Sequence, residues 1–208
     1  MSEFIGQRGV SSVMETYCGI AFDLANPGPE MVCIEDIVTA LSREGRYANH
    51  TRLPWSVLSH EVLVAMLVAR RVDDPVAVAV ALHHDDSEAY TGDIHRPLKA
   101  LLGEVFKQIE NNVQSAIHEH FGLPWPVPEY IAAEVKRADN IACRAEARIF
   151  MRSRGKSWHW GDVPEIELDE LHESTETVRI WRQINADPAL YPRMCGGQQI
   201  GALLREVE

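Results

Sequence analysis

The sequence predicts an all-α fold, and three features support that prediction. Apolar residues recur at steps of three and four over long stretches, which is the pattern of one helix face. Capping residues, prolines and glycines lie near the ends of several of these stretches. Alternation of polar and apolar residues, which is typical of half-buried strands, is nearly absent. Even residues 76–82 alternate only between valine and alanine before Leu82, all of them apolar.

The first part of the chain contains an irregular segment and two predicted helices. Glycines and prolines interrupt residues 1–33, so we expect no regular structure there. A helix is predicted from Ile34 to about Gly45, followed by a loop over residues 46–54. A second helix is predicted over residues 56–71. That stretch is apolar all round, so we expect it to be central.

The middle of the chain continues the helical pattern. Asp74 is a good cap and Pro75 suits the first helical position, so a third helix is expected to run from Pro75 towards Glu88. Helical spacing then extends over residues 98–121 and stops at Gly122.

Two more long helices are expected in the remainder. Residues 128–154 form one of them, with apolar positions at steps of three and four. A loop over residues 155–164 carries Trp158 and Trp160, which we expect to pack the helices together. A last helix is predicted over residues 165–185, and the tail from Pro188 onward is weakly specified.

Length and composition predict a single ordinary globular domain. The chain has 208 residues, 46% of them hydrophobic and 25% charged. We therefore treat residues 1–208 as one domain, with its core at about residues 32–150 and a C-terminal helix and tail at residues 165–208. The net charge of −11 argues against a broad nucleic-acid-binding face, which would have to be basic.

The cysteines and the apolar runs predict a cytoplasmic protein. Cys18, Cys33, Cys143 and Cys195 are scattered without any Cys-x-x-Cys pair, so we expect free thiols in a reducing compartment rather than a zinc ribbon. The N-terminus has no apolar segment of the kind found in secretory signals. The longest apolar run has eight residues, Val62 to Ala69, and a membrane span needs about 20.

One stretch predicts a metal site. The apolar run that ends at Leu82 delivers His83, His84 and Asp85 to its end, with further carboxylates after them. Buried carboxylates are costly unless they pair, accept hydrogen bonds or hold a metal. A neutral imidazole nitrogen next to an anionic oxygen suits a divalent cation of intermediate softness.

Further residues on apolar helix faces fit the same site. His60 and Asp139 lie on the inward faces of two other predicted helices, and Glu88 shares a helix face with His84 and Asp85. Each has a structural alternative: a buried histidine is more often a hydrogen-bonded core residue, and Asp139 has basic neighbours in the sequence. The combination of His60, His84, Asp85 and Asp139 is what favours a metal.

The order His60, then His84-Asp85, then Asp139 resembles the H…HD…D pattern of the HD-domain metal-dependent phosphohydrolases. The stretch His84 to Ile94, with Pro97-Leu98-Lys99, is similar to the branch typified by bacterial 5'-deoxynucleotidases. Ile34 to Ile37, Arg46, His50, Pro54 and Ser59-His60 resemble a phage- and prophage-associated group of that branch, which includes viral enzymes that remove triphosphate from dATP. The resemblance spans roughly residues 32–150.

The resemblance implies a compact helical bundle and a role for each motif residue. His60, His84, Asp85 and Asp139 would bind one divalent ion, and His83 would support them. Glu88 and Asp93 are the implied acid/base residues. The proposed substrate-binding residues are Arg46, as a phosphate clamp, with Tyr47 and Lys99; Arg96 is a weaker candidate. Two positions depart from the family: Asp86 replaces a small apolar residue, and Tyr47 replaces the Trp of bacterial 5'-deoxynucleotidases.

The expected activity is removal of phosphate from nucleoside 5'-monophosphates, including deoxy forms. Release of triphosphate from a nucleoside triphosphate and nucleotide sensing without turnover are the alternatives. The donor set tolerates Mn, Co, Ni, Fe or Zn, and Mg suits a triphosphate substrate. We expect a homodimer that acts on a small nucleotide, with neither a nucleic-acid polymer nor a membrane as its partner.

Overall fold

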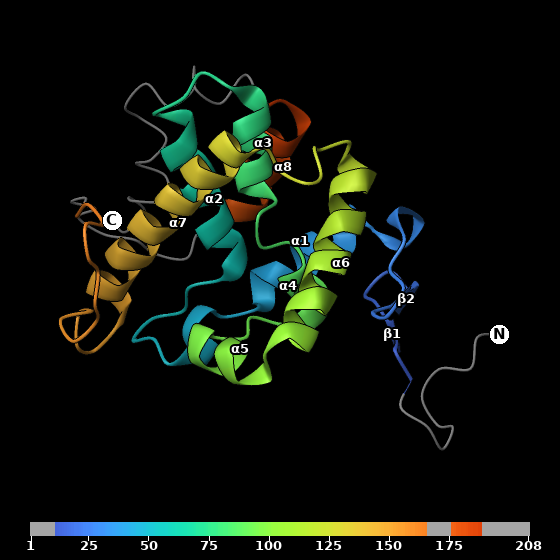
Figure 1. The fold of residues 1–208 in the computed structure, drawn as a ribbon, viewed down its shortest axis with the longest axis horizontal. Coiled ribbons are helices and arrows are strands. Elements are labelled where there is room, and N and C mark those ends of the chain that lie inside the picture. Colours follow the sequence, from blue (N-terminus) through green and yellow to red (C-terminus); the bar gives the residue numbers. More distant parts are fainter. Residues whose placement is uncertain (1–10, 166–175, 189–208) are drawn as a thin grey trace.

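The chain is mostly helical, as the sequence predicts. The computed structural model describes residues 11–165 and 176–188, and most of these lie in helices (Figure 1). The helix α2 (Val57–Ala69) packs against α3 (Pro75–Leu82), α7 (Glu129–Phe150) and α8 (Thr177–Ala186). None of the described helices is both long and apolar enough to cross a membrane.

Helix α2 is the central element, and its sequence explains why. Every residue from Val57 to Ala69 except Leu67 is buried, which confirms the predicted central position. Ser56 caps the helix, because its hydroxyl accepts a hydrogen bond from the Ser59 N–H at 3.1 Å. Since the helix has no solvent face, its polar side chains have to find partners inside the protein.

Helix α3 begins as predicted but ends earlier than expected. The Asp74 carboxylate accepts hydrogen bonds from the N–H groups of Val76 and Ala77, and Pro75 occupies the first turn. The helix stops at Leu82 instead of reaching Glu88, and turns lead to the short α4 (Glu88–Thr91). The side chain of Gln114 explains this end: it donates to the His83 carbonyl and accepts from the Ser87 N–H, so it replaces helical hydrogen bonds.

The helix predicted over residues 98–121 is two helices. They are α5 (Arg96–Leu102) and α6 (Glu104–Phe121), and they separate at Gly103, whose φ of +73° is left-handed. The predicted stop at Gly122 is confirmed. Helix α7 ends at Phe150, before the predicted Arg154. In the last predicted helix, Glu165 is not helical, α8 begins at Thr177, and residues 166–175 lie outside the described residues.

A small β-hairpin occupies part of the segment that we expected to be irregular. Strands β1 (Val13–Glu15) and β2 (Ala21–Asp23) pair antiparallel beside α6 at one edge of the molecule (Figure 1). The fold is therefore not strictly all-α. Phe22 anchors the hairpin: it is fully buried and stacks on Tyr90 of α4, with ring centroids 3.9 Å apart. Strands of three residues are too short to show a clear alternating pattern.

Helix α1 (Ile34–Arg43) leads into a tight loop. This helix packs against α2 and α4. In the 3-10 turn Arg46–Asn49, Tyr47, Ala48 and Asn49 all have positive φ, between 50° and 61°. The turn is tied back by the Arg46 N–H, which donates to the Trp55 carbonyl at 2.9 Å. It thereby directs the side chains of Arg46 and Tyr47 towards α7.

Candidate metal centre

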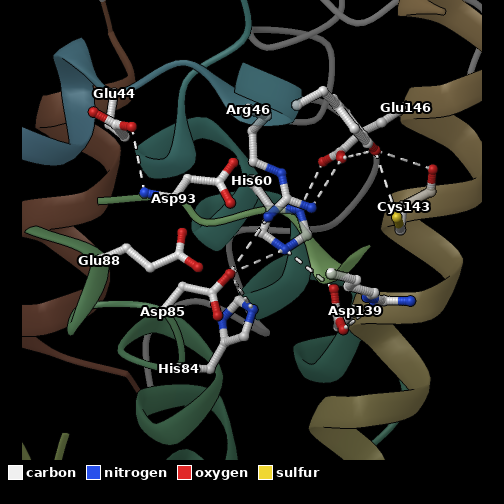
Figure 2. Close-up of polar contacts among 12 residues, drawn as sticks. Glu44, Arg46, His60, His84, Asp85, Glu88, Asp93, Asp139, Cys143 and Glu146 are labelled. Carbon is white, nitrogen blue, oxygen red and sulfur yellow. Dashed lines mark hydrogen bonds and ion pairs between the residues drawn. The ribbon is translucent and has the colours of Figure 1, made fainter. Parts of the chain in front are cut away.

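Four predicted ligands converge from two helices and a turn (Figure 2). His60 comes from α2, His84 and Asp85 from the turn after α3, and Asp139 from α7. One donor atom from each of His60, His84 and Asp85 lies within 4.8 Å of the others. The Asp139 Oδ1 lies 3.4 Å from the His60 Nε2. The sequence pattern therefore correctly identified residues that meet in space.

Both imidazoles turn the same nitrogen towards the centre. The Nδ1 of His60 lies 2.7 Å from the Glu146 Oε1, and the Nδ1 of His84 lies 2.8 Å from the Ala81 carbonyl oxygen. These acceptors fix the proton on Nδ1 and leave Nε2 as the free donor atom, which is the usual arrangement of histidine ligands. The Nε2 atoms of both rings are buried and have no hydrogen-bond partner.

Asp139 is oriented by cations on its outer side. Its Oδ2 accepts from the Lys136 Nζ at 2.8 Å and from Arg96 at 3.3 Å, so its Oδ1 is left to face His60. The two orphaned nitrogens and the adjacent carboxylate oxygens form a donor set that fits a divalent cation of intermediate softness. A cation would satisfy the buried nitrogens and neutralise the carboxylates together.

Glu146 is a central residue that sequence reasoning missed. It is fully buried on α7, and its carboxylate accepts hydrogen bonds from His60, from the Trp55 Nε1 at 2.9 Å and from the Tyr47 hydroxyl at 2.9 Å. Burial favours the neutral form, but His60 and Arg46 outweigh it and lower the pKa of Glu146 to about 2. One signal was available: Glu146 follows Asp139 by seven residues, so it lies on the same helix face.

Arg46 and Tyr47, predicted to bind substrate, lie beside the centre with their polar groups engaged. The guanidinium of Arg46 lies 3.5 Å from Asp85 and 3.4 Å from Glu146, and it is buried. The Tyr47 hydroxyl donates to Glu146. Their place in substrate binding stays a prediction. What the structure adds is that both connect the left-handed turn to the acidic residue behind His60.

The predicted acid/base residues lie on the other side of Asp85 (Figure 2). The Oε1 of Glu88 accepts from the Lys99 Nζ at 3.0 Å, and its Oε2 is buried without a partner. Burial, reinforced by the charges of Asp85 and Asp93, raises the pKa of Glu88 well above its usual range. The half-buried Asp93 is held through its N–H, which donates to the Glu44 carboxylate at 3.3 Å. Lys99 also pairs with Glu110 at 2.7 Å.

The charges of the centre perturb its own ligands. Burial and Arg46 act to lower the pKa of His60, but Glu146 and Asp139 outweigh them and raise it to about 9. Burial acts to raise the pKa of Asp139, yet His60, His84 and Lys136 hold it far below its usual range. The neighbouring carboxylates therefore favour positive charge at His60.

A second buried polar layer lies behind the ligands. The Nδ1 of His83 lies 2.5 Å from the Asp86 carboxylate, and its Nε2 lies 2.8 Å from Asn185 of α8. Glu61 accepts from the Trp181 indole at 3.0 Å. Asp86 thus has a buried histidine partner, which accounts for an acidic residue at that position. His83 packs behind the site instead of facing the ligands.

No protein-family model matches the chain. Over 134 residues it is 34% identical to the uncharacterized protein RCAP_rcc00048 of Rhodobacter capsulatus, covering 62% of this chain and 68% of that protein. Over 147 residues it is 35% identical to the uncharacterized protein YfdR of Escherichia coli, covering 71% of this chain and 77% of that protein.

Proposed function

This chain belongs to one family with YfdR of Escherichia coli, and we propose that it is a divalent-metal-dependent phosphohydrolase of the HD-domain type. Its proposed reaction is the removal of phosphate from nucleoside 5'-monophosphates, including deoxy forms. One observation carries the proposal: the unpartnered Nε2 atoms of His60 and His84 face the carboxylates of Asp85 and Asp139.

The proposed ligands are His60, His84, Asp85 and Asp139. A divalent ion bound there supplies positive charge for the phosphoryl oxygens and lowers the pKa of a bound water. The chain itself keeps the ligands in place. Glu146 and the Ala81 carbonyl hold the two imidazoles in one tautomer, while Lys136 and Arg96 orient Asp139.

Glu88 is the proposed acid/base residue. Burial and the neighbouring carboxylates raise its pKa and so favour the protonated form, and its Oε2 is buried without a partner. A protonated carboxyl group at the edge of the centre can donate to the nucleoside oxygen that leaves when the phosphate ester is cleaved. Lys99 and Glu110 hold it in position, and Asp93 adds the negative charge that favours protonation.

Substrate attraction depends on local cations, because the net charge of −11 repels nucleotides. Arg46 is the proposed phosphate clamp. Its contact with Asp85 is long, at 3.5 Å, and phosphate oxygens offer the guanidinium a better bidentate partner. The Arg46 contact with Glu146 at 3.4 Å keeps the guanidinium at the centre during that exchange.

A nucleoside triphosphate that loses triphosphate is the second candidate substrate. The observation that favours it is the pair of cations outside Asp139: the side chains of Arg96 and Lys136 are 64% and 61% exposed. Both contact Asp139, and a longer phosphate chain would compete with that carboxylate for them. Such a substrate would bring Mg²⁺ with it, whereas the monophosphate reaction depends on Mn, Co, Ni, Fe or Zn in the centre.

Product analysis distinguishes these reactions. Metal-loaded protein is incubated with mixed nucleoside monophosphates and triphosphates, in ribose and deoxyribose forms, and the products are separated by ion chromatography. Release of phosphate supports the proposal, and release of triphosphate supports the second candidate. If neither is released, nucleotide sensing without turnover is the remaining hypothesis. Asp139→Ala is the inactive control. Asp73→Ala changes an exposed aspartate elsewhere and should leave activity intact.

A further inference from the structure

A second group of metal-binding side chains lies at the N-terminal hairpin. Cys18 follows β1, Cys33 precedes α1, and Asp36 lies in the first turn of α1. One donor atom from each lies within 4.8 Å of the others. The two sulfur atoms are 3.3 Å apart, although fifteen positions separate the residues in sequence. The folded chain thus brings together thiols that look scattered in the sequence.

Asp36 is the residue that points to a ligand. It is only 3% exposed, and its Oδ1 accepts from the Cys18 N–H at 2.7 Å. Its Oδ2 is buried and has no hydrogen-bond partner. Among the described residues no lysine or arginine forms an ion pair with Asp36. Arg182 pairs with the neighbouring Glu35. A buried carboxylate left this way is costly, and a bound cation removes the cost.

We propose that Cys18, Cys33 and Asp36 form a zinc site separate from the candidate catalytic centre. Two thiolates and one carboxylate match the ligand types of Zn²⁺. The exposed Cys18 gives the ion a path from solvent and leaves the fourth position to water. Glu35, whose Oε2 lies 3.5 Å from the Cys33 sulfur, is a further oxygen donor.

The sulfur separation favours a metal over a disulfide. Zn–S bonds of about 2.3 Å at a tetrahedral angle place two sulfurs about 3.8 Å apart, so the observed 3.3 Å has to widen by only about 0.5 Å. A disulfide needs about 2.05 Å, which is a larger change in the opposite direction. The Asp36 carboxylate also attracts a cation.

The site would have a structural consequence. Cys18 lies in the turn between β1 and β2, and Cys33 is the residue before α1. The Cys33 N–H also donates to the Tyr90 hydroxyl at 3.5 Å, and Tyr90 stacks on Phe22. Zinc bound here would link the hairpin turn to the start of α1, next to Tyr90 of α4.

Cobalt substitution tests the site directly. Full-length protein is stripped with a chelator under reducing conditions and titrated with Co²⁺. Sulfur bound to cobalt gives charge-transfer absorption in the near ultraviolet, which the nitrogen and oxygen ligands of the other centre do not produce. We expect this absorption in the wild type and in Asp139→Ala, and its loss in Cys18→Ser and Cys33→Ser. Elemental analysis should show one fewer zinc per chain in these serine variants.

Matched variants isolate the cluster from the other thiols. Cys143→Ser and Cys195→Ser should keep the absorption; Cys195 lies outside the described residues. Asp36→Asn retains an acceptor for the Cys18 N–H but loses the charge, so zinc affinity should fall at least about 10-fold. Because Cys18 is exposed, Cys18→Ser remains a fair test even if Asp36→Asn does not fold.

Three results would overturn the proposal. The first is the absence of sulfur–cobalt absorption from reduced wild-type protein, and the second is its persistence in Cys18→Ser. The third is a Cys18–Cys33 disulfide without metal in protein purified under reducing conditions, detected by mass spectrometry. Failure of the proposed function can be told apart from failure of the zinc site. A loss of metal from the candidate catalytic centre, as expected in Asp139→Ala, leaves the cobalt–sulfur absorption unchanged.

Discussion

The Nδ1 of His60 and the Oε1 of Glu146 lie 2.7 Å apart, although 86 positions separate the two residues in sequence. Both side chains are fully buried, so this contact joins the central helix α2 to α7 inside the core. It also sets which nitrogen of His60 faces the candidate centre. One pair of residues therefore determines both a packing contact and the tautomer of a proposed ligand.

Glu146→Gln should damage both stability and metal binding. The amide removes the charge that His60 and Arg46 face in the core, so the free energy of unfolding should fall by about 3 kcal/mol. Metal affinity should fall by about 10- to 100-fold, as for other partners of histidine ligands. Urea denaturation and metal titration measure the two effects. The exposed Glu129→Gln is the control, and equal behaviour of both variants would refute the role of Glu146.

Asp139→Ala should abolish tight metal binding by the centre. It removes one of the two carboxylates and leaves the cations Lys136 and Arg96 without their partner. The melting temperature in the presence of metal should also fall, because metal binding no longer contributes to the free energy of unfolding. Elemental analysis of the purified variant gives the answer. Full occupancy of the centre in Asp139→Ala would remove Asp139 from the ligand set.

Glu88→Gln should separate catalysis from metal binding. The amide keeps the shape of the carboxyl group but cannot exchange a proton, so turnover should fall by about 100-fold or more while the metal stays bound. Glu104→Gln is the control, because Glu104 is exposed and pairs with Lys107 on the surface. If metal content and activity fell together in Glu88→Gln, Glu88 would be a ligand.

Metal uptake should depend on pH through His60. Its pKa is raised to about 9 in the metal-free protein, so binding at neutral pH has to displace a proton. Apparent affinity should therefore rise with pH up to about 9, by about 10-fold per pH unit where this proton dominates. Calorimetry in buffers of different ionisation enthalpy counts the released proton. Affinity that does not change between pH 6 and pH 9 would contradict this assignment.

The same pKa predicts the opposite trend for the stability of the metal-free protein. A histidine whose folded pKa is raised contributes stability that is fully present below its unfolded pKa, about 6.5. That contribution is lost as pH rises through about 9. Denaturation of chelator-treated protein over this range should show falling stability, and His60→Gln should reduce the slope. A slope unchanged in His60→Gln would assign the effect to another group.

Arg46→Lys should weaken activity although it keeps the charge. A lysine cannot span Asp85 and Glu146 or donate two parallel hydrogen bonds to phosphate, so kcat/KM should fall by about 10-fold or more. Arg52→Lys is the control, because Arg52 is exposed and its guanidinium donates to the Ile149 carbonyl, away from the acidic residues of the centre. Wild-type kinetics in Arg46→Lys would leave Arg46 as a structural residue of the left-handed turn.

Local signals in the sequence predicted most of the described helices and the residues that meet at the candidate centre. The cap at Asp74 and the stop at Gly122 act within one helical turn, so they can be recognised without knowing the fold. Breaks that depend on tertiary contacts were missed. Helix α3 ends where Gln114 intervenes from α6, and that hydrogen bond joins residues 31 positions apart. The hairpin was missed because three-residue strands carry little pattern.

The partners of the ligands were harder to predict than the ligands. His60 and Asp139 belong to a recognisable pattern, whereas Glu146 becomes important only because four donors from distant segments meet it. The meeting of Cys18 and Cys33 likewise depends on the hairpin. The sequence pattern includes His60 and Asp139 themselves. The burial of their partner Glu146 depends on the packing of α2 against α7, which the pattern does not contain.

The side-chain amide of Gln114 takes the place of a backbone peptide group beside the turn that carries His84 and Asp85. It donates a hydrogen bond to the His83 carbonyl and accepts one from the Ser87 N–H, so it holds the backbone on both sides of the turn. The orientation of these two proposed ligands therefore depends on α6, which contributes none of the four. If the centre binds a metal, substitutions on the buried face of α6 should change its geometry without replacing any proposed ligand.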